Sequence, residues 1–271
     1  MNKFKMICLD IDGTLLNSEH KISQNTKEAI RIAINEKNIP VILVSARMPK
    51  GILFLLKELN VSQPIICYSG ALVMDDKTNI ISNVTIPIID VEAVFKFAKE
   101  IGIHVSLYRN DEWYIEKIDK WAKQESEITN ISPSIIDFHN LFHAWKQKDS
   151  GPNKILCMAE PNELKLLYTK ISEHHFNELN VYNSKPTYLE IMPQSASKTS
   201  AIEILSRKFG IERSEIIAIG DNYNDISMIE FAGIGIAMGN APSEVKQCAD
   251  EITLCNDEDG VAESIKKYIL V

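Results

Sequence analysis

The sequence predicts an α/β fold built on a parallel sheet, with an α+β segment inserted into it. Apolar runs alternate with helix-periodic segments near both ends of the chain, which is typical of a parallel sheet covered by helices. From about residue 79 to 193 the strand patterns are mixed with polar residues, which favours an antiparallel sheet with one wet face. The 271 residues are 45% apolar and 24% charged, a composition that is ordinary for a globular protein and long enough for a sizeable core.

The first α/β part is predicted from three continuous apolar runs and two helical stripes. Ala29, Ile30, Ala33 and Ile34 recur at helical spacing, and Pro40 ends that helix. Apolar runs without alternation indicate strands that are buried on both faces. The expected elements are a strand over 7–9, a helix over 23–37, a strand over 41–44, a helix ending near 59 and a strand over 64–68.

The middle of the chain is predicted to be a separate domain, and the α/β pattern resumes after it. In the middle we expect strands over 104–109, 113–116, 154–159 and 188–192, and helices over 91–100, 119–125 and 162–175. Residues 128–151 give no clear pattern. After the middle we expect a helix over 197–209, strands over 216–219 and 235–239, and helices over 242–248 and 259–268. Residues 1–82 and 194–271 would therefore form one domain, and residues 83–193 an inserted α+β domain.

Charge and cysteine usage limit the classes of function. The net charge of -8 argues against nucleic acid and against anionic membrane surfaces as partners. A small anionic substrate remains compatible, because one metal ion and one lysine reverse the local field. The five scattered cysteines are typical of a reducing compartment. The apolar run behind the basic start is too short for a signal peptide, and no run is long enough to span a bilayer, so we expect a cytoplasmic protein. The sequence is silent on oligomeric state.

The first strand ends in two carboxylates, Asp10 and Asp12, followed by Gly13 and Thr14. Side chains alternate along a strand, so the two carboxylates leave its end on the same side and repel each other unless a cation or a proton intervenes. A simple turn is an alternative, since Asp and Gly are common turn residues. A calcium loop is excluded because its sixth and twelfth positions would be Leu15 and Lys21 instead of Gly and Glu. One glycine is also too few for a phosphate-cradling loop.

Polar groups follow the other apolar strands as well. Ser45-Ala46-Arg47 comes after 41–44, Ser69-Gly70 after 64–68, and the segment from Gly220 to Asp225 after 216–219. In an open parallel sheet, ligands bind at the carboxyl ends of the strands, so we expect these groups to meet in one crevice. Each fragment alone is also compatible with a turn or a helix cap. Lys198 is less ordinary, because a cation in the first turn of a helix is disfavoured by the macrodipole. Carboxylates, a lysine and a hydroxyl together fit a Mg²⁺ site that holds a phosphoryl group.

These segments resemble the four motifs of the haloacid dehalogenase superfamily, and more narrowly its Cof-type sugar-phosphate phosphatases. The motifs are Asp10-Ile11-Asp12-Gly13-Thr14, Ser45-Ala46-Arg47, Lys198, and the segment from Gly220 through Asn222, Tyr223 and Asn224 to Asp225. The likeness runs the full length and includes Gly239-Asn240-Ala241. The resemblance implies a Rossmann-like parallel-sheet core with an inserted α+β cap, a phosphoric monoester hydrolase, and a small phosphorylated metabolite as substrate.

The resemblance also implies roles for individual residues. Asp10 would be the nucleophile that forms an aspartyl-phosphate, and Asp12 the general acid and then the base. Mg²⁺ would be held by Asp10, the backbone carbonyl of Asp12 and Asp221, with Asp225 supporting the ion from behind. The groups expected to hold the phosphoryl oxygens are the side chains of Ser45, Lys198 and Asn224 and the backbone amides of Ile11 and Ala46. Two alternatives stay open, a phosphomutase of the same superfamily and a sugar-phosphate-binding regulator without turnover.

The chain departs from the family pattern at Ala46, Ser69 and Thr199, where the family usually has Gly, Asn and Gly. None of these changes removes a carboxylate, so they bear on substrate geometry and rate. The substrate would be selected by the inserted domain, because the core contacts only phosphate and metal. The side chains expected on its inner face, or else in its own core, are His104, Tyr108, Trp113, Tyr188 and Glu190.

Overall fold

The computed structural model describes residues 2–176 and 178–270, which form two compact units. The first unit comprises Met1–Arg47, Ile52–Ser82 and Ser197–Val271, and the second comprises Met48–Gly51 and Asn83–Ala196. Residues 194–196, which the sequence analysis groups with the first part of the chain, belong to the second unit here. Each unit has its own sheet.

In the sheet of the first unit, β1 lies between β12 and β2 and ends at Asp10, two residues before Asp12. Strands β14, β13, β12, β1, β2 and β3 follow one another in parallel, and β4 pairs with β3 in the antiparallel sense before β5 ends the sheet. All residues of β1, β2, β3 and β12 are buried, which explains their continuous apolar runs. The strands are β1 (Met6–Asp10), β2 (Val41–Val44), β3 (Ile65–Cys67), β4 (Leu72–Met74), β5 (Ile80–Asn83), β12 (Ile216–Gly220), β13 (Ile234–Ala237) and β14 (Glu251–Ile252).

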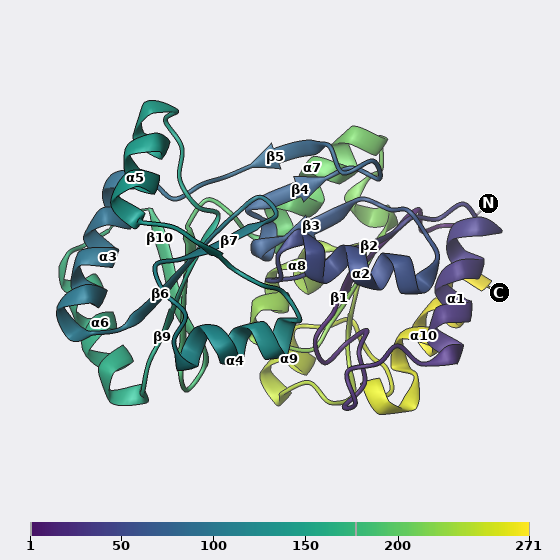
Figure 1. Ribbon diagram of the computed structural model, residues 1–271. Coiled ribbons are helices and arrows are strands. Elements are labelled where there is room, and N and C mark those ends of the chain that lie inside the picture. Colours follow the sequence, from purple (N-terminus) through teal and green to yellow (C-terminus); the bar gives the residue numbers. More distant parts are fainter. Residues whose placement is uncertain (1, 177, 271) are drawn as a thin grey trace. The chain divides into compact units, whose positions relative to one another are not determined.

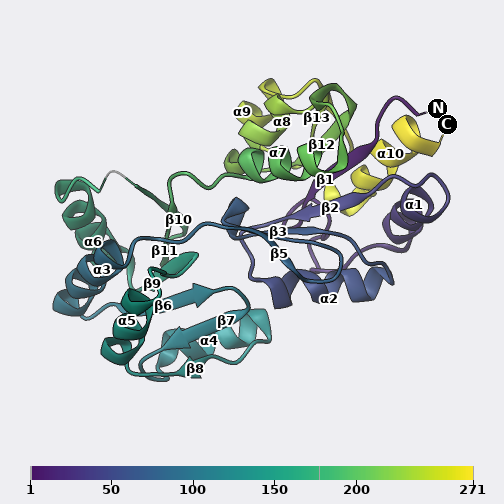
Figure 2. The same cartoon turned by 90° about the horizontal axis from the view of Figure 1, so that it is seen from above.

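Helices cover both faces of this sheet. Helices α7, α8 and α9 lie on one face, and α1 and α2 lie on the other (Figure 2). Residues of α7 and α8 pack with alternate residues of β1, β2 and β12, among them Met6, Cys8 and Ala218. Ser23 caps the start of α1 and Gly210, in the left-handed conformation, ends α7. The helices are α1 (Gln24–Asn35), α2 (Pro49–Leu59), α7 (Lys198–Phe209), α8 (Ile226–Phe231), α9 (Ser243–Gln247) and α10 (Gly260–Ile265).

The second unit is a six-stranded sheet with helices on both faces (Figure 1). The strand order is β10-β11-β9-β6-β7-β8, and the pairs are antiparallel except for β7 with β8. Residues of α3, α5 and α6 form one apolar core with alternate residues of the sheet, such as Leu107, Ile155 and Ile191. The elements are α3 (Ile88–Ile101), β6 (His104–Arg109), β7 (Glu112–Ile115), α4 (Lys120–Thr129), β8 (Ser134–Ile135), α5 (Phe138–Gln147), β9 (Lys154–Met158), α6 (Pro161–Glu173), β10 (Leu179–Lys185) and β11 (Tyr188–Pro193).

The prediction of a wet face on this sheet is wrong. The second face of β6, β9 and β11 is polar in composition, but its side chains are buried. Helix α4 contributes the reason, because its buried Glu125 accepts hydrogen bonds from the hydroxyls of Tyr108 and Tyr188. Polar groups are buried at low cost when they are hydrogen-bonded to one another, so a polar pattern here does not mean exposure to water.

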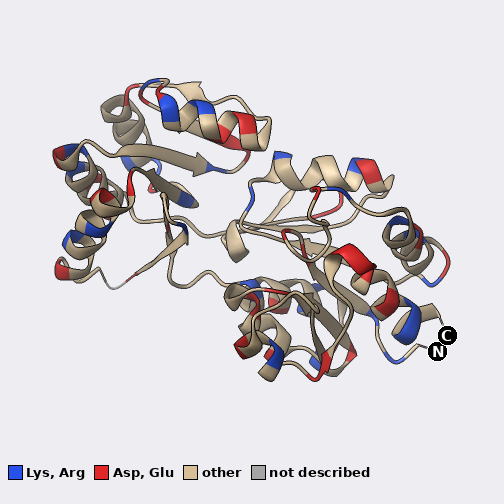
Figure 3. Ribbon diagram, turned by 90° about the horizontal axis from the view of Figure 1, so that it is seen from below, with Lys and Arg blue, Asp and Glu red and all other residues tan. Residues whose placement is uncertain are grey.

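Lys and Arg residues are interspersed with Asp and Glu residues along the helices of each unit (Figure 3). Within residues 2–176 and 178–270, no helix has the length and apolarity that crossing a bilayer requires. Because the net charge of -8 disfavours anions at long range, attraction of an anionic ligand depends on the local arrangement of charges in the site.

Candidate active site

The carboxyl ends of three neighbouring strands bring the predicted site residues together. Strand β1 lies between β12 and β2, with Leu9 opposite Ile219 and Asp10 opposite Val44. Because the three strands are parallel and in register, they end at the same edge of the sheet. Asp10 and Asp12 follow one strand, Ser45 the second and Asp221 the third. The convergence that the strand pattern predicts is therefore present in the fold.

Lys198 is buried between two carboxylates. It lies at the start of α7, where Ser197 caps the helix, and its side chain is only 1% exposed. Its Nζ donates to Asp10 Oδ1 at 2.5 Å and to Asp225 Oδ1 at 2.5 Å. Asp225 Oδ2 in turn accepts from the backbone N–H groups of Asp221 and Asn222, both at 3.0 Å. The lysine is thus fixed by charge partners on two other elements, which explains a cation in a first helical turn.

Three carboxylates are close enough to share one cation. Oxygens of Asp10, Asp221 and Asp225 lie within 4.8 Å of one another. Thr14 Oγ1 donates to Asp221 Oδ1 at 2.6 Å and fixes that carboxylate. Gly13 has φ +87°, and a Cβ there would lie 2.4 Å from Asp221 Oδ2, so only glycine fits this approach. Oxygen donors of this kind suit a hard divalent cation.

The electrostatics of the cluster also favour a cation. Burial, and after it the neighbouring Asp225, raise the pKa of Asp10 well above its usual range, while Lys198 opposes the rise. Burial raises the pKa of Asp221 to about 6 against the effect of the Thr14 hydrogen bond. Burial lowers the pKa of Lys198, but the two adjacent carboxylates outweigh it and raise that pKa above its usual value. The carboxylates are held under mutual repulsion that a divalent ion would relieve.

Asp12 lies outside this cluster and has a partner of its own. Arg47 Nε donates to Asp12 Oδ2 at 2.9 Å, and Arg47 Nη2 donates to Asp12 Oδ1 at 2.5 Å. The side chain of Asp12 is 54% exposed, whereas that of Asp10 is 9% exposed. Two aspartates two positions apart therefore lie in different environments, one buried beside an ammonium and one open to solvent beside a guanidinium. The site has four carboxylates, Asp10, Asp12, Asp221 and Asp225, and two cationic side chains, Lys198 and Arg47. Its formal charge of -2 is the charge that one divalent cation would neutralise.

Ser45 is buried at the end of β2 and is tied to the turn after β3. Its Oγ accepts from the backbone N–H of Arg47 at 3.2 Å, and its carbonyl accepts from the N–H of Ser69 at 2.9 Å. Tyr68 and Ser69 both have φ +50°, and a Cβ on Gly70 would lie 2.1 Å from the Ser197 carbonyl oxygen. Ser69 Oγ is buried without a hydrogen-bond partner among the described residues, so the turn acts through its backbone.

The remaining predicted residues are more varied in their surroundings. Ile11 is fully buried, Ala46 is partly buried, and Asn224 is exposed in the turn Tyr223–Asp225. Sequence reasoning gave no role to the side chains of Arg47 and Thr14, or to Asn240, whose Nδ2 donates to the Gly13 carbonyl at 2.9 Å. Each of these three residues lies within one of the motifs named above, and that position is the sequence signal for a role at the site.

The side chains singled out in the inserted segment share the polar face of the second sheet. Tyr108 stacks on Trp113 with ring centroids 5.8 Å apart. His104 Nδ1 lies 2.8 Å from Asp119 Oδ2, and its Nε2 lies 2.9 Å from Ser106 Oγ. Glu190 Oε2 lies 3.5 Å from Lys154 Nζ. The polar and aromatic residues on this face are His104, Ser106, Tyr108, Trp113, Lys154, Tyr188 and Glu190, and all of them are buried, as expected if they belong to the core of the inserted segment.

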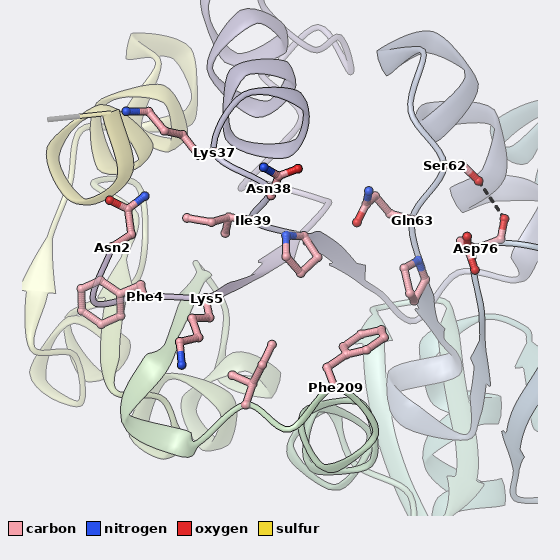
Figure 4. A pocket seen from close by; sticks show the side chains of 13 residues that line it. Asn2, Phe4, Lys5, Lys37, Asn38, Ile39, Ser62, Gln63, Asp76 and Phe209 are labelled. Atoms are coloured by element: carbon pink, nitrogen blue, oxygen red, sulfur yellow. Dashed lines mark hydrogen bonds between the residues drawn. The ribbon is translucent and has the colours of Figure 1, made fainter.

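A cavity of about 640 Å³ lies at the opposite edge of the first sheet, away from the carboxylates. Figure 4 shows Asn38 and Gln63 on one side of this cavity, from the segments before β2 and β3. Phe4 and Lys5, which precede β1, and Phe209, at the end of α7, lie on the other side. Its lining residues include one carboxylate side chain, from Asp76, which is too few for a metal centre. The candidate active site is therefore the carboxylate edge.

Comparison with known proteins agrees with this geometry. The model of the haloacid dehalogenase-like hydrolase family matches residues 7–265. A relative from Haemophilus influenzae, classed provisionally as a phosphatase, is 34% identical over 96% of both chains. The 5-amino-6-(5-phospho-D-ribitylamino)uracil phosphatase YcsE of Bacillus subtilis is 29% identical over 98% of this chain and 96% of its own. The solved structure of the HAD subclass IIB sugar phosphatase BT4131 is 26% identical, with a TM-score of 0.81, and covers 98% of this chain and all of its own.

Proposed function

The chain belongs to the haloacid dehalogenase-like hydrolase family and is a phosphoric monoester hydrolase. We propose that it hydrolyses sugar phosphates with Mg²⁺ through an aspartyl-phosphate. The observation that carries the proposal is the buried contact of Lys198 with Asp10 inside a cluster of three carboxylates. A nucleophilic carboxylate has to remain anionic next to an anionic substrate, and this arrangement supplies the charge that permits it.

The proposed Mg²⁺ ligands are the carboxylates of Asp10 and Asp221 and the backbone carbonyl of Asp12. Asp225 supports the site from behind, since its two oxygens are already engaged by Lys198 and by backbone N–H groups. The site fits such an ion because its donors are oxygens and its charge balance lacks two positive charges. When bound, the ion neutralises phosphoryl oxygens and orients them toward the nucleophile.

Asp10 is proposed to attack phosphorus, and the leaving alcohol departs with a proton from Asp12. Asp12 is suited to proton transfer because its side chain is half exposed and can meet both the leaving group and a water molecule. The same carboxylate then takes a proton from the water that hydrolyses the aspartyl-phosphate. The groups proposed to hold the phosphoryl oxygens meanwhile are the side chains of Ser45, Lys198 and Asn224 and the backbone amides of Ile11 and Ala46.

A sugar phosphate is the proposed class of substrate. The polar side chains singled out in the second unit are buried and bonded to one another, so they stabilise that unit and do not form an open binding surface. The similarity to BT4131, named as a sugar phosphatase, supports the same class.

The test is phosphate release from a panel of hexose, pentose and polyol phosphates, with Mg²⁺ and after treatment with a chelator. We expect Mg²⁺-dependent turnover by the wild type and its loss in Asp10→Asn, which keeps the size of the side chain and removes the nucleophile. Asp111→Asn, at an aspartate of the second unit, is the control and should keep full activity. Equal activity of the wild type and Asp10→Asn would refute the proposed mechanism.

A further inference from the structure

The side chain of Arg47 donates hydrogen bonds to both oxygens of the Asp12 carboxylate. The contacts are Nε to Oδ2 at 2.9 Å and Nη2 to Oδ1 at 2.5 Å, a two-point pairing that fixes the rotation of the carboxylate as well as its position. The backbone of Arg47 is fixed in turn, since its N–H donates to Ser45 Oγ and its carbonyl accepts from the N–H of Tyr68, both at 3.2 Å. Asp12 is therefore oriented through a chain of contacts that begins at the end of β2.

We propose that Arg47 is a positioning residue for Asp12 and thereby makes the enzyme effective on phosphates with poor leaving groups. This inference rests on the proposed function. An alkoxide leaves well only if it receives a proton as the P–O bond breaks, and that proton comes from Asp12. A half-exposed carboxylate without a partner rotates among several orientations, and proton transfer requires one of them. Arg47 selects an orientation, and it also pairs with the carboxylate that remains after the proton has left.

The arrangement also defines what has to change during the reaction. Both Asp12 oxygens accept hydrogen bonds from Arg47, so an oxygen that carries a proton toward the leaving group gives up one of these two contacts. The other contact keeps Asp12 attached. Phosphorus is transferred to Asp10, the P–O bond electrons go to the leaving oxygen, and the Asp12 proton joins that oxygen, so charge and atoms balance. A lysine in place of Arg47 would offer a point charge without a two-point grip.

Leaving-group dependence separates this role from others. Nitrophenolate is a stable anion that leaves without a proton, whereas the alkoxide of a sugar does not. The ratio kcat/KM reports only the steps up to departure of the leaving group, so it excludes the later attack by water, which also uses Asp12. We expect Arg47→Met to lower kcat/KM about 100-fold for the best sugar phosphate of the panel, and less than about 3-fold for 4-nitrophenyl phosphate.

Two further variants make the test specific. Arg47→Lys should fail to restore the sugar phosphate reaction, because charge alone does not orient a carboxylate. Arg31→Met is the matched control, since Arg31 also uses Nε and Nη2, here on the carbonyls of Leu59 and Glu58 away from the site, and it should leave both substrates unaffected. In an Asp12→Asn background, Arg47→Met should have no further effect on the sugar phosphate.

The outcomes are distinguishable from those that test the proposed function. A wild type without activity on any phosphate ester would refute the function. An active wild type in which Arg47→Met lowers kcat/KM equally for both substrates would overturn the inference and assign Arg47 to the phosphoryl group or to the fold. Full rescue by Arg47→Lys would overturn it as well, since the role would then be one of charge alone.

Discussion

Lys198→Met replaces the buried ammonium by an apolar side chain of similar length. In the folded protein this leaves the carboxylates of Asp10 and Asp225, whose side chains are 9% and 0% exposed, without the cation that each contacts at 2.5 Å. Breaking a buried ion pair by removing one partner costs about 3–5 kcal/mol, because the remaining charge stays desolvated. Since two carboxylates lose their partner, we expect a loss of about 4 kcal/mol or more in the free energy of unfolding at pH 8 in the presence of a chelator.

The loss should depend on pH in a defined direction. Without the ammonium, nothing opposes the burial and the neighbouring Asp225 that raise the pKa of Asp10, so the folded variant binds a proton at Asp10 more tightly than the unfolded chain does. Stability then falls as the pH rises through the unfolded and folded pKa values, and it is regained as the pH falls. We therefore expect the deficit of Lys198→Met to be clearly smaller at pH 5 than at pH 8, and Mg²⁺ at pH 8 to recover part of it.

The assay has to follow the first unit, because the three tryptophans, Trp113, Trp121 and Trp145, all lie in the second. Far-UV circular dichroism during urea unfolding, with amide hydrogen exchange of β1 and β12, reports the site, and tryptophan emission reports the second unit. Lys208→Met, an exposed position in the same helix, is the control and should change stability by less than about 0.5 kcal/mol. A deficit that is equal at pH 5 and pH 8, or equal to that of Lys208→Met, would refute the electrostatic reasoning.

Three further outcomes are expected. Gly13→Ala should raise the Mg²⁺ concentration for half-maximal activity at least about 10-fold, because the added Cβ displaces Asp221. Gly102→Ala is the control, since Gly102 also has a positive φ but a Cβ there would meet no atom within 4 Å, and the Mg²⁺ concentration should stay unchanged. Equal effects of the two substitutions would contradict the steric argument. Asp119→Asn should cost about 1–2 kcal/mol at pH 7. Burial raises the pKa of Asp119, but hydrogen bonds from backbone N–H groups and His104 outweigh burial and hold this pKa below its usual value. In acid unfolding scans, the cost should therefore vanish as the pH falls from the usual value through the lowered pKa of the folded protein. Mg²⁺ at about 100 times its dissociation constant should raise the free energy of unfolding by about 2.7 kcal/mol, and calorimetry showing no change would argue against a resident cation.

The strand ends of the first unit could be predicted because burial on both faces makes a parallel strand a continuous apolar run. The end of such a run marks the sheet edge where ligands bind, so Asp10, Ser45 and Asp221 could be grouped although they are far apart in sequence. The contact of Lys198 with Asp225 follows from the same edge, but its geometry depends on how α7 packs on the sheet. That packing leaves no periodic signal of its own.

Other features had no usable signal. The segment over 128–151 contains α5, whose aromatic residues Phe138, Phe142 and Trp145 pack together in the core of the second unit. Aromatic residues are enriched in strands, and a short apolar run cannot be assigned to a helix or a strand from its periodicity alone, so the pattern is ambiguous. The polar residues of the second sheet predict an exposed face, because residue type predicts burial of polar groups only when their partners are known. Its partner, Glu125, lies on a helix whose position over the sheet is a tertiary property.

The pairing of each aspartate with a different cation would explain how one strand end performs the two kinds of chemistry that we propose. Asp10 is buried beside the Lys198 ammonium, which opposes the rise in the pKa of Asp10 that burial and Asp225 cause. Asp12 extends into solvent, and the planar guanidinium of Arg47 orients it without burying it. A nucleophile needs the first environment, and a group that gives up and takes back a proton in each cycle needs the second. If Asp10 were exposed beside a guanidinium and Asp12 buried beside an ammonium, neither would suit its proposed role, although every carboxylate would still be present. We infer that Lys198 and Arg47 determine which aspartate acts as nucleophile and which transfers the proton.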